Sequence, residues 1–258
     1  MAYDSESDRV IMSCGFDMSG PSSWSLEDTW AYDLTTNTWT QMKAKAPVAH
    51  LICKMAYDSE SDRIILFGGW DIPNDQIFQD TWAYDYNTDT WTDMKPAVSP
   101  PGRNAQSMTY DSKADRILLW GGDSSTNHNP NPPKNRAIWS YDFNTNTWEE
   151  RVADLQPPQY FASAMAYDTS ADRSIFYGGT ITENGSTAMW AYDYSNNAWI
   201  ELKPSPNPGL LSWNEMVYLP IPRSLFLFGG VTGQDMLWGK TWLYDYPTNT
   251  WTEVVPKP

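Results

Sequence analysis

The chain has 258 residues, of which 41% are hydrophobic and 15 are tryptophan, and this composition favours a folded protein over a disordered one. Its formal net charge of −15, with 17 basic residues scattered singly, disfavours nucleic acids and anionic membrane surfaces as partners. No apolar run is long enough to cross a membrane, and no signal-like leader stands at Met1. We therefore expect no nucleic-acid partner, no membrane partner and a cytoplasmic setting.

The chain opens on a motif that returns four times. "MAYDSESDRVIMSCG" begins at Met1, and related stretches with the same interval of fourteen residues from Met to the last Gly begin at Met55, Met108, Met165 and Met216. Each copy reads as a strand, a polar turn and a second strand, so the constant spacing indicates a rigid hairpin. We expect left-handed backbone at the turn aspartates, which are Asp8, Asp62, Asp115 and Asp172.

A second hairpin follows in every repeat. "DTWAYDLTTNTW" at 28–39 has later copies at 80–91, 137–148, 188–199 and 240–251, and nine residues separate the two tryptophans in all five. Left-handed backbone is expected two residues before the second tryptophan, at Asn37, Asp89, Asn146, Asn197 and Asn249. The two hairpins together predict four short strands in each repeat.

The second strand of the repeat indicates the architecture. The segments "IILF" (64–67), "ILLW" (117–120) and "LFLF" (225–228) are apolar at every position, which is typical of a strand covered on both faces. Tandem four-stranded sheets satisfy this pattern when they stack face to face around an axis. We expect the ten repeated tryptophans to fill the space between sheets, and a change from Trp to Ala there to cost about 3–5 kcal/mol.

The paired glycines, with a Tyr after them and a Trp seven residues beyond that Tyr, resemble the kelch repeat. The matching residues are Gly68-Gly69/Tyr84/Trp91, Gly121-Gly122/Tyr141/Trp148, Gly178-Gly179/Tyr192/Trp199 and Gly229-Gly230/Tyr244/Trp251. The first copy, Cys14-Gly15/Tyr32/Trp39, departs from the pattern in its cysteine. The resemblance implies an all-β fold, a single β-propeller of five four-stranded antiparallel blades. Their approximate ranges are 1–43, 48–95, 101–152, 158–203 and 209–254.

Closure of this ring is the open question, because kelch propellers usually have six or seven blades. The first repeat lacks counterparts of "RNAQS" (103–107) and "HLICK" (50–54). We expect a closed five-blade ring whose seam depends on side-chain packing between blades five and one, since an open array exposes two apolar faces. The alternative is a segment of something larger. The closed ring predicts a monomer, and exposed terminal blades predict an oligomer.

Candidate binding residues lie in the two intervals that vary in length, which meet at one rim of the propeller. By resemblance to kelch domains, partners dock on that rim. Its aromatic candidates, and the loop carboxylate beside them, are Trp24, Trp70, Asp75, Phe78, Tyr160, Trp213 and Trp238. An inter-blade position near the channel mouth adds His50 and Arg103. The planar guanidinium of Arg103 makes it the best candidate for gripping a carboxylate, with a salt bridge to a neighbouring loop as the plain alternative.

The sequence offers few residues for catalysis or for binding a metal or cofactor. Only His50 and His128 exist, on different loops, and no phosphate loop follows the glycine pairs. Some propellers of this type carry iron on a Glu-x3-Asp-x3-His run, and this chain has no such run. Cys14 and Cys53 are too few for a disulfide framework, so we expect two free thiols inside strands. We expect no cofactor, no metal and no catalytic residue.

Three functions remain. The first is a binding or scaffold module that captures a protein or peptide partner on the loop rim, without chemistry of its own. The second is a carbohydrate-binding or carbohydrate-acting propeller with its site at the channel mouth. The third is a stand-alone or engineered scaffold ring, suggested by the near identity of "MAYDSESDRVI" and "MAYDSESDRII".

Overall fold

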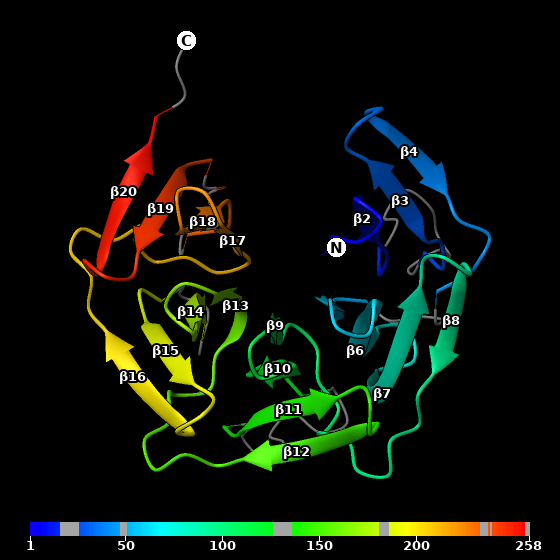
Figure 1. Ribbon diagram of the computed structural model, residues 1–258. Coiled ribbons are helices and arrows are strands. Elements are labelled where there is room, and N and C mark those ends of the chain that lie inside the picture. Colours follow the sequence, from blue (N-terminus) through cyan, green and yellow to red (C-terminus); the bar gives the residue numbers. More distant parts are fainter. Residues whose placement is uncertain are drawn as a thin grey trace.

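The computed structural model describes residues 1–15, 26–46, 51–125, 136–180, 186–232, 237 and 239–255. These residues form twenty strands in five four-stranded sheets, each in sequence order from the inner to the outer strand (Figure 1). Every pair of neighbouring strands within a sheet is antiparallel. The sheets surround one axis, so the predicted all-β propeller of five four-stranded blades is confirmed. Among the described residues, no helix is long and apolar enough to cross a membrane.

Each blade contains two hairpins. Blade one has β1 (Ala2–Asp4), β2 (Arg9–Met12), β3 (Trp30–Asp33) and β4 (Thr38–Gln41). Blade two has β5 (Lys54–Asp58), β6 (Arg63–Asp71), β7 (Gln76–Asp85) and β8 (Thr90–Asp93). Blade three has β9 (Ser107–Asp111), β10 (Arg116–Trp120), β11 (Ile138–Asp142) and β12 (Thr147–Arg151). Blade four has β13 (Phe161–Asp168), β14 (Arg173–Thr180), β15 (Met189–Asp193) and β16 (Ala198–Leu202), and blade five has β17 (Glu215–Leu219), β18 (Ser224–Phe228), β19 (Thr241–Asp245) and β20 (Thr250–Val254).

The turn residues set the hairpins, as the sequence predicts. The φ angles of the four turn aspartates lie between 54° and 56°, and those of the five residues before the second tryptophan lie between 47° and 55°. Only Gly, and to a lesser degree Asn and Asp, tolerate this conformation easily. The tyrosine hydroxyl of the third strand closes each second hairpin by donating to the same turn residue, as Tyr84 does to Asp89 at 2.9 Å. Both families of turn are therefore specified by short polar side chains.

Neighbouring blades are joined by the tryptophan of the outer strand. The Trp148 indole of blade three lies 5.2 Å from the Phe67 ring of blade two and donates from Nε1 to the Thr81 hydroxyl at 2.8 Å. Trp199 contacts Trp120 and Trp251 contacts Tyr177 across the next two interfaces, at 5.6 and 5.3 Å between ring centroids. Each of these three outer tryptophans thus packs on the aromatic residue that precedes the glycine pair of the blade before it.

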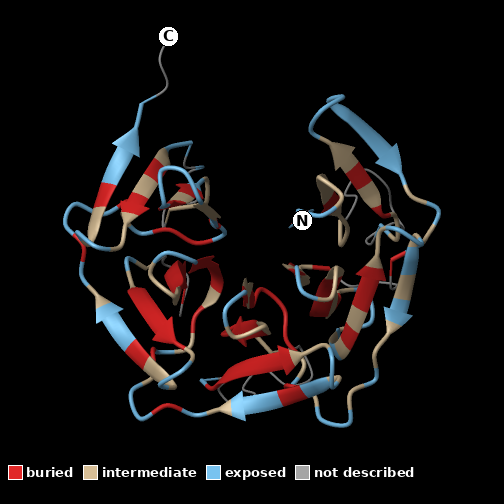
Figure 2. Cartoon of the chain, in the orientation of Figure 1, coloured by how far each residue is buried: buried red, intermediate tan, exposed pale blue. Residues whose placement is uncertain are grey.

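The interface between blades five and one breaks this series. Trp39, the outer tryptophan of blade one, is 45% exposed, whereas Trp148, Trp199 and Trp251 are 2–4% exposed. Its expected contact, Phe228 of blade five, is 52% exposed, although Phe67, Trp120 and Tyr177 are fully buried. In Figure 2 the outer strand β4 is exposed along its length, and β1 has no packing on β17 comparable to that between the other inner strands. The expected packed seam, and the core position expected for Trp39, are therefore wrong.

Cys14 and Cys53 form a disulfide, with 6.1 Å between their Cα atoms, so the expectation of two free thiols is also wrong. Cys14 stands where the later repeats have the first glycine, and its φ of 65° matches the 64–76° of those glycines. Cys53 immediately precedes the inner strand of blade two. The bond therefore fastens blade one to blade two.

The outer tryptophans offer a matched pair of variants. Trp148→Ala removes a buried ring and its hydrogen bond to Thr81, so we expect it to lower the free energy of unfolding by about 3–5 kcal/mol. Trp39→Ala removes the equivalent but exposed ring, and we expect a loss of about 1 kcal/mol. Urea unfolding of both variants measures the difference. Equal losses contradict the open seam.

The disulfide gives a second prediction. Its loop of 39 residues is expected to contribute about 2–4 kcal/mol by restricting the unfolded chain. Reduction with a phosphine should therefore lower the Tm of the wild type and leave the Tm of a Cys14→Ser/Cys53→Ser double variant unchanged. A wild-type Tm that does not change on addition of the reductant contradicts the presence of the Cys14–Cys53 disulfide.

Candidate functional site: the central channel and its upper mouth

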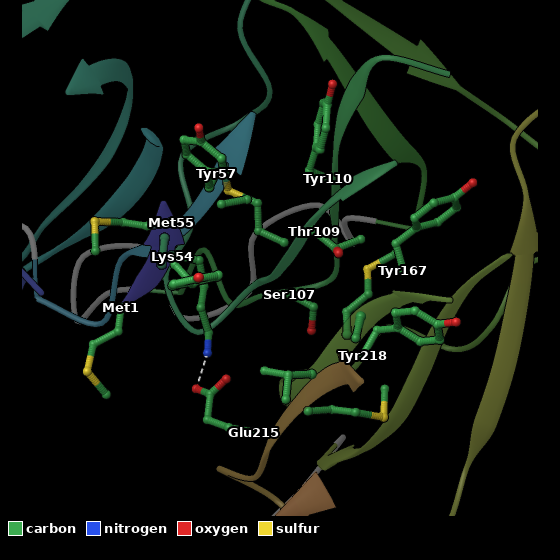
Figure 3. Close-up of a pocket in the computed structure, with 18 of the residues that line it drawn as sticks. Met1, Lys54, Met55, Tyr57, Ser107, Thr109, Tyr110, Tyr167, Glu215 and Tyr218 are labelled. Atoms are coloured by element: carbon green, nitrogen blue, oxygen red, sulfur yellow. Dashed lines mark hydrogen bonds and ion pairs between the residues drawn. The ribbon is translucent and has the colours of Figure 1, made fainter. Parts of the chain in front are cut away.

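The inner strands of all five blades line a central channel of about 570 Å³. Figure 3 shows the strands converging on it, with methionine and tyrosine side chains along its wall. The end at which each inner strand begins is called the upper mouth. The second strand of each blade ends on the same side, and the third strand begins there. The other end, at the turns that follow the inner strands, is the lower mouth. A cavity of this size accepts a small molecule or a few residues of a peptide.

The upper mouth is bordered by a chain of backbone hydrogen bonds. Its members lie three residues before each internal methionine: Ile52, Ala105, Ala162 and Trp213. All four have left-handed φ angles between 51° and 58°. The amide of Ala105 donates to the Ile52 carbonyl at 3.2 Å, Ala162 to Ala105 at 2.8 Å, and Trp213 to Ala162 at 2.7 Å. This chain fixes the spacing of blades two to five around the opening.

Two polar contacts lie just inside the upper mouth. Lys54 Nζ of blade two and Glu215 Oε1 of blade five approach to 2.5 Å and form an ion pair (Figure 3). The hydroxyls of Ser107 and Ser163 are 2.6 Å apart in blades three and four. The amino group of Met1 lies close to Lys54 and Glu215, and burial lowers its pKa although Glu215 acts in the opposite direction. The entrance to the channel thus carries charge on one side and hydroxyls on the other.

The lower mouth is bordered by tyrosines. Tyr57, Tyr110 and Tyr167 each donate a hydrogen bond of 2.9 Å to the turn aspartate of their own blade. Burial is the main cause that raises the pKa of these hydroxyls, so they remain neutral donors. Tyr218 in blade five has no such partner, because Arg223 occupies the turn position. The lower mouth is therefore acidic and already satisfied by its own hydrogen bonds.

Arg103 does not lie open at the mouth, and the prediction that it grips a ligand carboxylate there is wrong. Its side chain is fully buried, with Nε donating to the Pro101 carbonyl and Nη1 to the Gly121 carbonyl, both at 3.0 Å. Burial lowers the pKa of its guanidinium to about 9. Arg103 ties the connection that precedes β9 to the end of β10, because two carbonyls lie within its reach and no carboxylate of the described residues forms an ion pair with it. Sequence gives no sign of this, since an arginine on a loop is ordinarily solvated.

Other predicted residues divide between structure and surface. Tyr160 is 7% exposed and packs at a tilt against Trp120 and Phe176 inside the interface between blades three and four. Trp70 and Phe78 are partly buried, because β6 and β7 continue past the glycine pair as a ladder in which Trp70 pairs with Ile77 and Gly69 with Phe78. Asp75 lies in the turn of that hairpin, with a φ of 51°.

Trp213 is the predicted aromatic residue that the structure places openly at the upper mouth. It is 50% exposed, beside Ala162 and two residues before Glu215. Trp24, Trp238 and His50 lie outside the described residues. The structure thus brings Trp213 to the mouth and places Tyr160 in the core.

Lys54, Glu215 and the serines of the mouth were missed by sequence reasoning. Their position in the repeat could have identified three of them, because Lys54, Ser107 and Glu215 each stand immediately before the methionine of a repeat. A residue at a constant place in the inner strand projects at a constant depth in the channel. Within the part of the chain that the structure describes, no group of three or more His, Cys, Asp or Glu side chains is arranged to hold a metal ion. The arrangement is suited to recognition by hydrogen bonds and aromatic contact.

Comparison with protein families agrees with the fold. The family described as the KLHDC2/KLHL20/DRC7 Kelch-repeats domain matches residues 52–258. The chain therefore belongs to the kelch-repeat family, and the matched residues include blades two to five. The match begins after blade one, the blade in which Cys14 replaces glycine.

Several curated proteins are similar to this chain. Mei4-dependent protein 6 of Schizosaccharomyces pombe is 26% identical over 69% of the chain and 27% of its own length. Kelch domain-containing protein 10 of Xenopus tropicalis is 23% identical over 78% of the chain and 51% of its own length. N-(sulfonatooxy)prop-2-enimidothioate sulfolyase of Thlaspi arvense is 22% identical over 75% of the chain and 59% of its own length. The chain thus spans between about a quarter and three fifths of these relatives.

Arg103 yields a prediction about stability. Arg103→Ala leaves a cavity and removes the hydrogen-bond donor of the Pro101 and Gly121 carbonyls. We therefore expect it to lower the free energy of unfolding by about 3 kcal/mol. Arg103→Met fills the space and removes a buried charge, so we expect a much smaller loss. Chemical unfolding distinguishes the two. An Arg103→Met variant as unstable as Arg103→Ala contradicts a space-filling role.

Proposed function

We propose that this kelch propeller is a non-catalytic binding module that captures a protein or peptide partner at its upper mouth. Propellers of this family generally serve as protein-interaction scaffolds. The single observation that carries the proposal is Trp213, an aromatic side chain held half exposed by a left-handed backbone two residues before Glu215, which lines the 570 Å³ channel. Exposed aromatic residues at the edge of a pocket are typical anchors for partner side chains.

Backbone rigidity supports this assignment. The amide of Trp213 donates to the Ala162 carbonyl at 2.7 Å, and the next residue back, Ser212, bridges to Val231 in both directions at 2.7 and 3.0 Å. A side chain fixed in this way loses little conformational freedom when a partner binds. Leu210, three residues earlier, is 51% exposed and extends the apolar surface. Two exposed apolar residues thus lie within six residues of Glu215, which forms the ion pair with Lys54.

Charge and compartment add two features to the proposal. The net charge of −15 favours a neutral or basic partner segment, because an acidic one is repelled as it approaches. The Cys14–Cys53 disulfide supports an oxidising compartment as the place of action. The binding module proposed here therefore acts on partners that share such a compartment.

A random peptide array tests the proposal with one variant and one control. Trp213→Ala is expected to weaken binding of peptides selected by the wild type at least tenfold, because an anchoring aromatic contributes about 2 kcal/mol or more. Leu34→Ala, which truncates an equally exposed residue in the turn between β3 and β4 at the opposite rim, is expected to leave binding unchanged. A glycan array run in parallel distinguishes peptide from carbohydrate capture. If the Trp213→Ala variant binds the selected peptides as tightly as the wild type does, the proposal is contradicted.

A further inference from the structure

The wall of the channel changes in chemistry with depth below the upper mouth. Small side chains line it two residues beyond the level of Lys54 and Glu215, and these are Ala56, Thr109, Ala166 and Val217. The methionines beside them also line the channel and are 4–7% exposed, namely Met55, Met108, Met165 and Met216. These eight residues are called the sleeve. The sleeve gives the middle of the channel a mostly apolar wall with room between the blades.

Below the sleeve the wall offers oxygen atoms. Tyr57, Tyr110 and Tyr167 line the channel there, and their hydroxyls donate to turn aspartates, so each phenol oxygen can still accept a hydrogen bond (Figure 3). The same blades add one aliphatic hydroxyl each two residues later, from Ser59, Ser112 and Thr169. These six residues are called the lower ring. The lower ring surrounds the end of the channel with hydrogen-bond acceptors from three blades.

Buried carboxylates stand directly behind the lower ring. Asp58, Asp111 and Asp168 each lie between the tyrosine and the hydroxyl residue of their blade, and they are 0–3% exposed. Turn formation occupies Oδ1, as in Asp111, which accepts from the amides of Lys113 and Ala114 at 3.1 and 3.0 Å. In the part of the chain that the structure describes, none of the three carboxylates forms an ion pair. Oδ2 of Asp168 has no hydrogen-bond partner at all.

These carboxylates make the lower end of the channel attractive to a cation. Burial raises the pKa of the Asp58 and Asp111 carboxyls, because their charge is held in a wall of low dielectric without a compensating cation. Lys54 is the only basic side chain among the described residues that line the channel, and it is already paired with Glu215. A cleft lined by charges of one sign focuses their field. A group that enters therefore gains most if it is apolar along its length and positive at its tip.

We propose that the channel is a lysine pocket, which admits a lysine side chain of the partner through the upper mouth. The methylene stem of that lysine packs on the sleeve, and its ammonium group lies among the oxygens and aromatic rings of the lower ring. The inference rests on the proposed function and names the partner residue that enters the channel. The backbone of the partner remains outside, on the side of the mouth where Trp213 is exposed.

Depth and acceptor geometry favour lysine over other side chains. The tyrosines stand three residues beyond the level of Ser107 in the inner strand, which is about 10 Å along a strand. Only a long side chain covers such a depth. Lysine has a four-carbon stem and a compact ammonium with three donors, which suits single hydroxyls supplied by different blades. The planar guanidinium of arginine is better matched by a carboxylate that accepts two bonds, and Glu215, which lies above the sleeve, is the only described carboxylate lining the channel.

A peptide series tests the chemistry of the pocket. The probe is acetylated and amidated Gly-Gly-Lys-Gly-Gly, and two further peptides carry norleucine or arginine in place of the lysine. Norleucine keeps an unbranched aliphatic stem and lacks the ammonium, so the lysine peptide is expected to bind at least about tenfold tighter. The arginine peptide is expected to bind more weakly than the lysine peptide. Isothermal titration calorimetry gives the three affinities. Equal binding of the lysine and norleucine peptides overturns the inference, and so does tighter binding of the arginine peptide.

A pair of charge variants tests the buried carboxylates. Asp58→Asn/Asp111→Asn keeps Oδ1 as an acceptor for the turn amides and removes two charges behind the lower ring. The preference for lysine over norleucine is expected to fall about fivefold, with the norleucine affinity unchanged. The control Asp33→Asn/Asp85→Asn removes two charges that are paired with Arg9 and Arg63 away from the channel, and the preference is expected to stay the same. A preference that survives the first variant, or that falls equally in the control, overturns the inference.

Methionine methyl NMR locates the bound side chain in the wild type. The lysine peptide is expected to shift the methyl signals of Met108 and Met165, which line the channel, and to leave that of Met94, which does not. Val217 is 52% exposed and lines the same channel, so Val217→Phe is expected to abolish binding of the lysine peptide. Undiminished binding by a folded Val217→Phe variant overturns the inference, as do wild-type shifts that leave out Met108 and Met165. If Val217→Phe fails to fold, the wild-type methyl signals decide alone.

Failure of the lysine pocket is distinguishable from failure of the proposed function. If array peptides bind in a manner dependent on Trp213 but the lysine and norleucine peptides bind equally, partner capture stands and the lysine pocket falls. If no array peptide depends on Trp213 while the lysine preference and the methyl shifts hold, the lysine pocket stands and the proposed anchor falls.

Discussion

The contact on which the structure depends is the outer tryptophan of one blade packed on the blade before it. A four-stranded sheet alone is a poor folding unit, and its second strand is apolar on both faces. The indole of Trp148 covers Phe67 and satisfies its own N–H on Thr81, so one side chain supplies both burial and register. Repetition of this contact builds the channel. The mouth and its binding residues exist only because the spacing of the blades is fixed.

The same contact explains why blade one differs from the others. Trp39 and Phe228 are each other's expected contacts by the repeat, yet 45% and 52% of their surfaces are exposed. Blade one instead gains a covalent link to blade two through Cys14 and Cys53. The disulfide thus compensates, on one side of the blade, for packing that is absent on the other. It also replaces a glycine in the only repeat where the pattern departs.

Much of the fold was predictable because it is local. The turn aspartates and asparagines, the apolar second strands and the constant intervals specify hairpins without reference to the rest of the chain. The disulfide was not predictable, because Cys14 and Cys53 meet only through packing between blades. Arg103 was misjudged because the carbonyls that receive its guanidinium, those of Pro101 and Gly121, are brought to it only by the folded chain. The sequence placed Trp213 on a loop at the upper mouth, and the structure has it there. The left-handed backbone that Trp213 shares with Ile52, Ala105 and Ala162 was not predictable, because these four residues have no side-chain type in common.

Solution measurement of the indole N–H groups tests this account most directly. Hydrogen exchange followed by NMR reports each tryptophan separately under native conditions. The structure predicts slow exchange for Trp91 and Trp148, whose indoles donate to Thr29 and Thr81, and fast exchange for the exposed Trp39. A Trp39 indole as protected as that of Trp148 contradicts the open seam.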